Sequence, residues 1–318
     1  MELAELQPMK LIAKRLNVSS HTVLRVLNQV GETMKPTYNY LPEHLSMDEF
    51  KSVKQVSGAM SLIFIDAQRH EIMDVVENRQ QSYLISYFMR YSLKARRQVK
   101  TVTMDMYSPF FQVIKSCFPN AKIIIDRFHI LQLLNRALNQ VRIIEMKKIR
   151  YLRGRDYTKF KRQWKLILKN YWQLNHEKPM TNRLYTGIVT EYIMLEYLLS
   201  VSPVLSRAYR LVNKLKDALH NRRFEQFEQI LKETKSETYP RKIRIALTTL
   251  ERYLEPIKNA FTYTLSNGPI EGMNNKVKNI KRSGYGYRNF LNLKHRIMIS
   301  FTLTTDSSEP KPIYYESN

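Results

Sequence analysis

Cysteine is almost absent from this sequence: Cys117 is the single one among 318 residues. One thiol cannot form a disulfide within the chain, and it cannot supply the ligands of a Cys-rich zinc module. Cys117 lies in an apolar helical stretch, which indicates a packing role. The scarcity of cysteine is typical of a reducing compartment, and we expect a cytoplasmic protein.

Long apolar runs are absent as well. No stretch approaches the roughly 18 consecutive apolar residues of a membrane span. The amino-terminal residues show no apolar signal-peptide core. We therefore expect no membrane partner.

Acidic residues are few compared with basic ones. The chain has 28 Asp and Glu against 52 Lys and Arg, which gives a net charge of +24 and a pI near 9.9. A hydrophobic content of 43%, with 20 Tyr and 13 Phe, indicates a folded protein. Such a basic excess predicts a polyanionic partner, most often nucleic acid, and a merely basic protein is the alternative.

Residues 99–129 carry the strongest structural signal. β-Branched residues lead into Asp105, apolar residues at helical spacing follow over 107–118, and the apolar run 121–125 ends in Asp126. This pattern predicts a strand, a helix and a second, parallel strand. Open α/β sheets place their chemistry at the carboxyl ends of such strands, so Asp105 is the first candidate for a functional residue.

Three short strands are predicted before this unit. They cover residues 47–50, 60–66 and 71–78, and a helix over 82–93 follows them. Asp48 lies on the first strand, and Asp66 precedes a turn that we expect it to form. The order β-β-β-α-β-α-β predicts an α/β protein with a ribonuclease H-like mixed sheet.

Helical periodicity dominates from residue 130 to about residue 261. Trp164 and Trp172 in this block are expected to pack between helices, and stacking on an unpaired base is the alternative. The predicted organisation has six parts. These are a helix-turn-helix (1–30), a linker (31–45), the first part of the catalytic core (46–135), an all-helical insertion (136–261), the last part of the core (262–303) and a loose tail (304–318).

The helix-turn-helix is predicted over residues 9–28. Asn17 tolerates the left-handed backbone of the turn, Val18 is expected in its core, and Ser19 or Ser20 can cap the second helix. Val23, Val26 and Leu27 of that helix are expected to face inward. Its outward face, which we expect to contact DNA, contains Ser20, His21, Thr22 and Arg25. An ordinary helical hairpin is the alternative.

A last motif occupies residues 266–278. Pro269 suits the first position of a helix, and Glu271 falls in the first turn, where the helix dipole favours a carboxylate. Polar residues follow Glu271 along this helix. Those that we expect to contact DNA are Asn275, Lys278, Lys281 and Arg282.

Asp48, Asp105 and Glu271 stand out because of their positions. Two neighbouring strands and one helix start can bring three carboxylates together, and such a cluster can hold two divalent cations for phosphodiester chemistry. Asp126 and His129 are secondary candidates. Asp126 is either the second acid or a helix cap, and His129 is either a metal ligand or a structural histidine.

Three stretches resemble the DDE transposases of bacterial insertion sequences. They are MDEF (47–50), the long segment 102–142 with its D-M and D-R-F-H motifs, and SNGPIEGMNNKVKNIKR (266–282). The resemblance is to the ISL-three family and runs from Asp48 to Phe301. It implies a ribonuclease H-like core that cleaves DNA and transfers strands, with Asp48, Asp105 and Glu271 as catalytic acids and metal ligands. It also implies two Mg²⁺ or Mn²⁺ ions in each active site and no nucleotide cofactor. The implied partners are the transposon ends and the target DNA, which are bound by a homodimer or a larger assembly.

Members of that family usually carry a Cys-rich zinc module ahead of the helix-turn-helix. The present sequence, with Cys117 alone, has no such module, and we expect a shortened member. An inactive, truncated remnant that only binds DNA is therefore the alternative function.

Overall fold

A computed structural model describes residues 7–302, so the tail expected at 304–318 lies outside the described residues. The chain divides into two compact units. Unit 1 joins the residues up to Asp126 to those from Thr264 onward, and unit 2 is Arg127–Tyr263. Unit 2 includes all residues of the predicted insertion (136–261) and extends beyond it at both ends.

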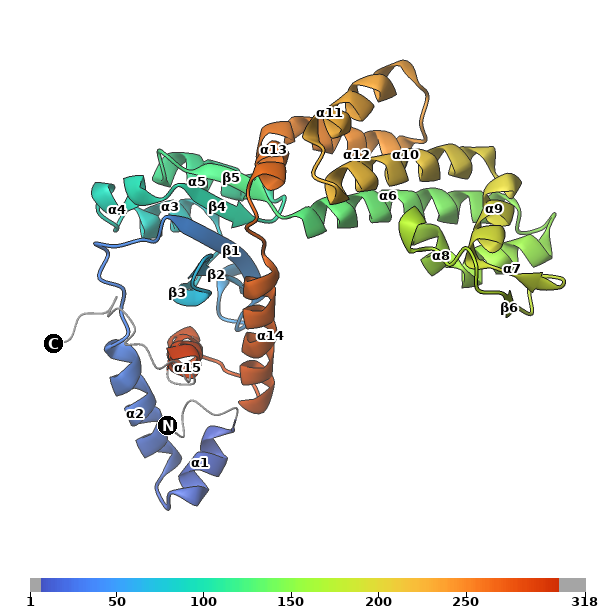
Figure 1. The fold of residues 1–318 in the computed structure, drawn as a ribbon. Coiled ribbons are helices and arrows are strands. Elements are labelled where there is room, and N and C mark those ends of the chain that lie inside the picture. Colours follow the sequence, from blue (N-terminus) through green and yellow to red (C-terminus); the bar gives the residue numbers. More distant parts are fainter. Residues whose placement is uncertain (1–6, 303–318) are drawn as a thin grey trace. The chain divides into compact units, whose positions relative to one another are not determined.

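Unit 1 is built on a five-stranded sheet, which Figure 1 shows beside the helix that carries Glu271. Its strands are β1 (His44–Lys51), β2 (Met60–Asp66), β3 (Glu71–Val76), β4 (Thr101–Met104) and β5 (Lys122–Ile125). Their order is β3-β2-β1-β4-β5. β2 is antiparallel to both β1 and β3, whereas β4 is parallel to both β1 and β5. The predicted α/β class and the parallel pair of strands around a helix are confirmed.

The helices of unit 1 follow the predicted order with one difference. They are α1 (Met9–Arg15), α2 (Ser20–Glu32), the 3₁₀ turn η2 (Ser57–Ala59), α3 (Gln81–Phe88), α4 (Leu93–Gln98), α5 (Ser108–Cys117), α14 (Gly268–Ser283) and α15 (Phe290–Thr302). The prediction of a single helix over 82–93 was wrong. The chain turns at residues 89–92 and starts α4, because the Ser92 hydroxyl accepts a hydrogen bond from the Ala95 backbone N–H at 3.2 Å and caps the new helix.

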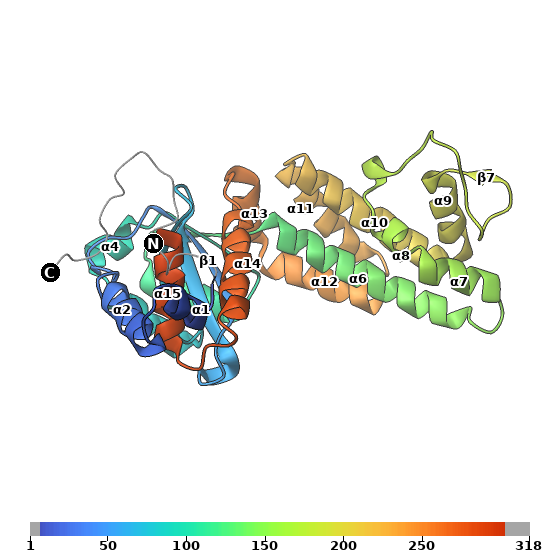
Figure 2. The same ribbon diagram turned by 90° about the horizontal axis from the view of Figure 1, so that it is seen from below.

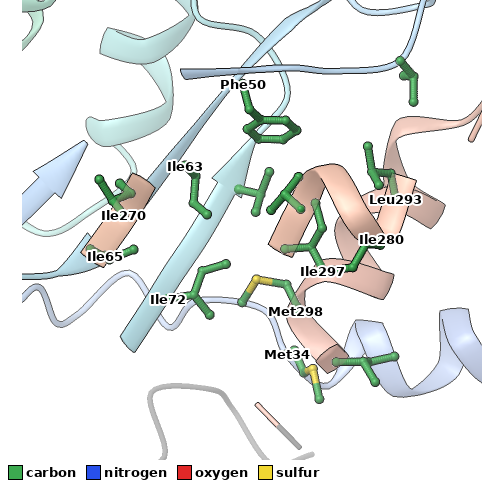
Figure 3. Packing of buried hydrophobic residues seen from close by; sticks show 14 of the residues in the cluster. Met34, Phe50, Ile63, Ile65, Ile72, Ile270, Ile280, Leu293, Ile297 and Met298 are labelled. Carbon is green, nitrogen blue, oxygen red and sulfur yellow. The ribbon is translucent and has the colours of Figure 1, made fainter. Parts of the chain in front are cut away.

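One hydrophobic core of unit 1 lies between the sheet and the helices α14 and α15 (Figure 3). The strands contribute apolar side chains such as Phe50, Ile63 and Ile65, and α15 contributes Leu293, Ile297 and Met298. The residues of α14 in this core are Ile270, Val277 and Ile280. Each fully buried side chain of this size stabilises the fold by about 1.5–3 kcal/mol. The three isoleucine and valine positions lie on one face of α14, so their packing also sets how the helix is rotated about its axis.

A buried ion pair joins β3 to α15, and the sequence did not indicate it. The Asp74 carboxylate on β3 is fully buried and pairs with the Lys294 ammonium of α15 at 2.6 Å. The Tyr87 hydroxyl of α3 donates a further hydrogen bond to Asp74 at 2.5 Å. A buried charge needs such partners, because an unpaired carboxylate in the interior costs several kcal/mol.

The helix-turn-helix has the predicted local geometry. Asn17 is left-handed, with φ of 52°. The Ser19 hydroxyl caps α2 by accepting a hydrogen bond from the Thr22 backbone N–H at 3.0 Å. Val18 and Val26 were expected inside and are instead 40% and 38% exposed. The buried residues of the small hydrophobic cluster between α1 and α2 are instead Ile12, Ala13 and Val23.

The linker expected over 31–45 was wrong in part, since much of it is packed into unit 1. Gly31 is buried against the His295 ring of α15, and a Cβ atom at Gly31 would lie 2.1 Å from Cγ of His295. Leu41 is fully buried, and β1 already begins at His44. The prolines of this segment predicted a loop. A loop in solvent and an irregular segment that is packed against the core have the same local sequence signals, so the sequence could not distinguish them.

Unit 2 is mostly helical. Its elements are α6 (Arg127–Lys148), α7 (Gly154–Arg162), α8 (Trp164–Leu168), η3 (Tyr171–Gln173), β6 (Met180–Thr181), β7 (Ile188–Val189), α9 (Glu191–Val201), α10 (Pro203–His220), α11 (Phe224–Glu233), η4 (Thr234–Ser236), α12 (Arg241–Arg252) and α13 (Leu254–Thr262). The long helix α6 packs against α10 and α12, which lie beside it in Figure 2. None of the helices within residues 7–302 is long and apolar enough to cross a membrane.

Two expectations for this unit were wrong. The insertion is not all-helical, because β6 and β7 pair as a short antiparallel ladder. Gly187, with φ of 77°, takes the left-handed conformation just before β7. Trp164 and Trp172 are not core residues either, since they are 41% and 38% exposed. Their helical spacing indicated packing, but only the tertiary arrangement decides which face of a short helix is covered.

Candidate active site

Asp48 and Asp105 lie in the same register on neighbouring parallel strands. The ladder between β1 and β4 ends at the pair of Ser46 and Thr103. The same step along both strands leads from Ser46 to Asp48 and from Thr103 to Asp105. Each aspartate therefore lies two residues beyond the last pair of the ladder, in which neighbouring strands are about 4.8 Å apart.

Asp126 extends this row by one strand. Met104 of β4 pairs with Ile125 of β5, and the next residues along the two strands are Asp105 and Asp126. The Asp126 backbone N–H donates to the Met104 carbonyl at 3.2 Å, which continues the ladder. Asp105 and Asp126 thus directly follow β4 and β5, and Asp48 lies within the neighbouring strand β1.

Helix α14 reaches this row through two asparagines. Nδ2 of Asn274 donates a hydrogen bond to Oδ2 of Asp48 at 2.6 Å. Nδ2 of Asn267 lies 3.3 Å from Oδ1 of Asp105, which accepts its hydrogen bond. The amino-terminal half of α14 therefore spans from one aspartate to the next.

Glu271 lies between the two asparagines. Asn267, Glu271 and Asn274 are spaced i, i+4 and i+7, which places them on one face of α14. The Asn267 backbone N–H donates to the Asp126 carboxylate, so the start of the helix is fixed to the end of β5. The helix turn with Glu271 therefore lies between two asparagines that are bonded to the aspartates.

The atoms of this site that could bind a metal ion are all oxygen atoms. Asp48, Asp105 and Glu271 are partly exposed, whereas Asp126 is only 5% exposed. Oδ1 of Asn267 and Oδ1 of Asn274 are buried and have no hydrogen-bond partner among residues 7–302. Carboxylate and amide oxygens are the ligands of hard cations such as Mg²⁺ and Mn²⁺. The residues present thus fit a divalent metal ion by their chemistry.

The carboxylates of the candidate site do not form one metal-binding group in this structure. In the described part of the chain, no three His, Cys, Asp or Glu side chains form a group that could hold a metal ion. Amide N–H groups are bonded to Asp48 and Asp105 instead. The predicted convergence of Asp48, Asp105 and Glu271 on shared cations therefore stays a prediction.

Comparison with known proteins decides the family. The family profile of ISL3-type DDE transposases, described as "Transposase", matches residues 45–297. The chain belongs to this family. Proteins of the DDE transposase family generally use divalent metal ions, and the oxygen-rich row of acids agrees with that property.

Two curated proteins are similar to this family member. One is the transposase for insertion sequence element IS1001 of Bordetella parapertussis, which is 24% identical over 284 residues, covering 87% of the chain and 66% of the relative. The other is named an ATP-dependent protease, from Lactococcus lactis subsp. lactis, and is 39% identical over 111 residues, or 35% of each protein. The chain thus spans about a third of one relative and just under two thirds of the other.

A cation beside the row was not found from the sequence. Arg79 forms an ion pair with Glu49, the residue after Asp48, and its guanidinium lies 5.2 Å from the centre of the Tyr107 ring. The hydrogen bond from Arg79 to Glu49 raises the pKa of Arg79. Arg79 and Glu49 therefore balance each other's charge next to Asp48.

The polar residues expected to contact DNA on α14 differ in their surroundings. Asn275, Lys278 and Arg282 are exposed. Lys281 is partly buried, and its Nζ donates to the Ser52 carbonyl at 3.0 Å and to the Lys51 carbonyl. Burial lowers the pKa of Lys281. Lys281 thus anchors α14 to the end of β1, so it is less available to a phosphate than the other two cations.

Three of the four DNA-contacting residues that were predicted on α2 are exposed. They are Ser20, His21 and Arg25. Thr22 is partly buried, and its hydroxyl lies 2.9 Å from the Ser19 hydroxyl. The buried face of α2 is formed by Val23, Leu27 and Gly31.

The remaining candidates have local roles. Asp66 forms the predicted turn, because its Oδ1 accepts hydrogen bonds from the Gln68 and Arg69 backbone N–H groups at 2.8 and 3.0 Å. His129 lies in the first turn of α6, in unit 2, with its ring edge-on to Phe128 at 5.4 Å between ring centres. Its predicted metal or proton-transfer role stays a prediction.

Proposed function

We propose that this member of the transposase family catalyses metal-dependent DNA strand cleavage and strand transfer of an insertion sequence. The observation that carries the proposal is the row of Asp48 and Asp105 in one register, with Glu271 on the helix that is bonded to both. Such a cluster of oxygen donors suits chemistry on a phosphodiester. The length of chain shared with the IS1001 transposase supports the same reaction.

We also infer that the core is ribonuclease H-like. Two antiparallel pairings on one side of β1 and two parallel pairings on the other, in the order β3-β2-β1-β4-β5, support this assignment. The order agrees with the β-β-β-α-β-α-β sequence of elements. In this fold the acid on β1 and the acid directly after β4 belong to the reactive centre.

Each residue has a stated role in the proposed reaction. Asp48, Asp105 and Glu271 would hold two Mg²⁺ or Mn²⁺ ions, and Asn267 and Asn274 would orient the two aspartates by hydrogen bonds. When bound, divalent cations activate a water molecule or a DNA 3′-hydroxyl and stabilise the leaving oxygen. No side chain of the chain becomes covalently attached to DNA. The amino end of α14 adds the positive end of its dipole beside Glu271.

Double-stranded DNA is the proposed partner, both as transposon ends and as target. The exposed cations Lys278 and Arg282 follow Glu271 along α14 and can bind phosphates near the acids. Ser20, His21, Thr22 and Arg25 of α2 are the proposed base-reading residues. We further propose that a homodimer or a larger assembly binds the DNA.

Plasmid nicking with Mg²⁺ or Mn²⁺ tests the proposed reaction. Asp105→Asn keeps the shape of the side chain and removes the charge that a cation needs, so cleavage is expected to collapse while DNA binding persists. The matched control is Glu225→Gln, a change of an exposed acid in unit 2, which is expected to leave cleavage unchanged. If Asp105→Asn cuts as well as the parent, Asp105 is not the second acid and Asp126 takes its place. DNA binding without any cleavage by the parent would favour the DNA-binding remnant.

The salt dependence of DNA binding tests the proposed contacts on α14. Each phosphate neutralised contributes about −0.9 to the slope of log K against log [salt] on duplex DNA. Changing Lys278 and Arg282 together to Ala is therefore expected to flatten the slope by about two. Lys281→Ala, the control, is expected to leave the slope unchanged, because the Lys281 ammonium is bonded to backbone carbonyls. A parent slope near zero would show that the basic charge does not serve DNA binding.

A further inference from the structure

Unit 2 contains a hollow that the proposed reaction does not use. It lies between α9, α10 and the turn η3, and its volume is about 530 Å³. Ligand sites of small molecules have volumes of about 300–1,000 Å³. Three aromatic side chains line the hollow and remain partly exposed: Tyr171, Trp172 and Tyr192.

These rings are held in place by their neighbours. Trp172 stacks on His220 at 5.0 Å between ring centres, with 29° between the ring planes, and it is still 38% exposed. The Tyr171 backbone N–H donates to Oδ1 of Asn213 at 3.0 Å, and the Tyr171 ring meets Tyr192 edge-on at 6.3 Å. Pre-ordered flat rings lose little conformational entropy when another flat group binds to them.

Two cations line the same hollow. Arg210 and Lys214 are exposed and lie one helical turn apart on α10. Of the two acids in the lining, Asp217 is already paired with Arg223, which leaves Glu196 as the second. The balance of charge is therefore positive beside the aromatic rings, and guanidinium and ammonium groups are the usual binders of phosphate.

We propose that this hollow binds one unpaired nucleotide of a DNA strand. The base stacks on Trp172 and Tyr171, Glu196 is placed to accept a hydrogen bond from an exocyclic amino group, and Arg210 and Lys214 hold the adjoining phosphate. Stacking of bases on aromatic side chains binds all four bases, because every base has a flat π-surface. The inference rests on the proposed action on DNA, and it adds a second site, in unit 2, that recognises DNA by unpaired structure.

The two tryptophans of the chain permit a direct test. Trp164 is as exposed as Trp172, at 41%, but does not line the hollow. Trp164→Phe therefore leaves Trp172 as the one tryptophan that reports on the hollow. Its fluorescence is expected to fall when a single-stranded oligonucleotide, or a duplex with one bulged base, is added. A fully paired duplex of the same length is expected to change it little.

Affinity measurements on variants complete the test. Trp172→Ala is expected to weaken binding to the bulged duplex by about 10- to 100-fold, the range typical of one lost base stack, and to leave binding to the paired duplex unchanged. Trp172→Phe, which keeps an aromatic ring, is expected to retain most of the affinity. Trp164→Ala is the matched control and is expected to bind every DNA as the parent does. Circular dichroism establishes that each variant is folded.

Four outcomes would overturn the inference. Equal losses on paired and bulged DNA would show that the hollow does not distinguish unpaired nucleotides, and no loss on either would show that Trp172 does not contact DNA. Quenching by a free deoxynucleoside monophosphate as strong as by the oligonucleotide would make a free nucleotide the ligand. If Trp172→Ala instead converts a dimer into a monomer in light scattering, the hollow is an interface between copies of this chain. Failure of the nicking reaction alone would leave the Trp172 result intact, so the two proposals fail separately.

Discussion

Asn274→Ala is the sharpest test of how the acids are positioned. The substitution removes the Nδ2 group that lies 2.6 Å from Oδ2 of Asp48. Hydrogen bonds to charged acceptors contribute about 1.5–3 kcal/mol. Asp48 is partly exposed, so water can replace the lost donor, and the Asn274 carbonyl oxygen that disappears had no partner within residues 7–302. The free energy of unfolding is therefore expected to fall by only about 1 kcal/mol.

The effect on metal binding is expected to be larger than the effect on stability. Removing a partner that orients a metal ligand typically costs about 10- to 100-fold in metal affinity or activity. Titration calorimetry with Mn²⁺ measures the affinity, plasmid nicking measures the activity, and urea unfolding measures the stability. Asn279→Ala, a change of an exposed asparagine of α14 that has no assigned DNA contact, is the matched control and is expected to alter none of the three.

Two further variants separate a positioning role from a structural one. Asn274→Asp places a second carboxylate against Asp48, so its melting temperature is expected to fall and to recover when Mn²⁺ is added, because like charges repel without a cation. In a double-mutant cycle, Asn274→Ala and Asp48→Asn are expected to lower Mn²⁺ affinity non-additively. A folded Asn274→Ala protein with parental Mn²⁺ affinity and nicking rate would refute the reasoning.

Three further predictions follow from buried groups. Burial lowers the pKa of Lys216 to about 8, below the roughly 10.4 of an unfolded lysine, so the unfolded chain binds more protons between these values and stability rises with pH there. The free energy of unfolding of Lys216→Met, measured with urea, is thus compared with that of the parent at two pH values. The difference in favour of the variant is expected to be about 2 kcal/mol smaller at pH 9.5 than at pH 7. An equal difference at both pH values would contradict the lowered pKa. Gly31→Ala would place a Cβ atom 2.1 Å from Cγ of His295 and is expected to cost about 1–3 kcal/mol in thermal unfolding, whereas Gly272→Ala, with no atom within 4 Å, is the control that costs nothing. Burial raises the pKa of Cys117 to about 11, so a thiol reagent at pH 8 is expected to label it only after urea is added, and labelling of the native chain would show that the thiol is accessible.

Features that depend on a few neighbouring residues were predicted correctly from the sequence. Asn17 takes the left-handed conformation, Ser19 caps α2, and Asp66 forms its turn. Asp105 follows a strand, and Glu271 lies in the first turn of a helix. Hydrogen bonds over two or three residues and the spacing of apolar side chains decide these features, so the sequence alone contains the information.

Features that depend on packing between distant segments could not be read in the same way. The helical spacing of Glu271, Asn275 and Lys278 predicts one functional face, yet Asn274 is the residue that contacts Asp48. The rotation of α14 about its axis is set by the apolar side chains that it buries against the sheet, and no local rule contains that choice. The same reason applies to the exposed tryptophans and to the buried pair of Asp74 and Lys294, whose partners lie far apart in the sequence.

The acids themselves show both sides of this division. The sequence by itself determined how far apart Asp48 and Asp105 lie along the chain, and that each falls on or directly after a strand. Only the tertiary structure decided that β1 and β4 are neighbours and that their register matches this separation. Backbone hydrogen bonds between strands fix a register to the single residue, because a slip of one residue turns every side chain to the other face of the sheet. That pairing of β1 with β4, and not the spacing along the chain, is what brings Asp48 and Asp105 to neighbouring strands.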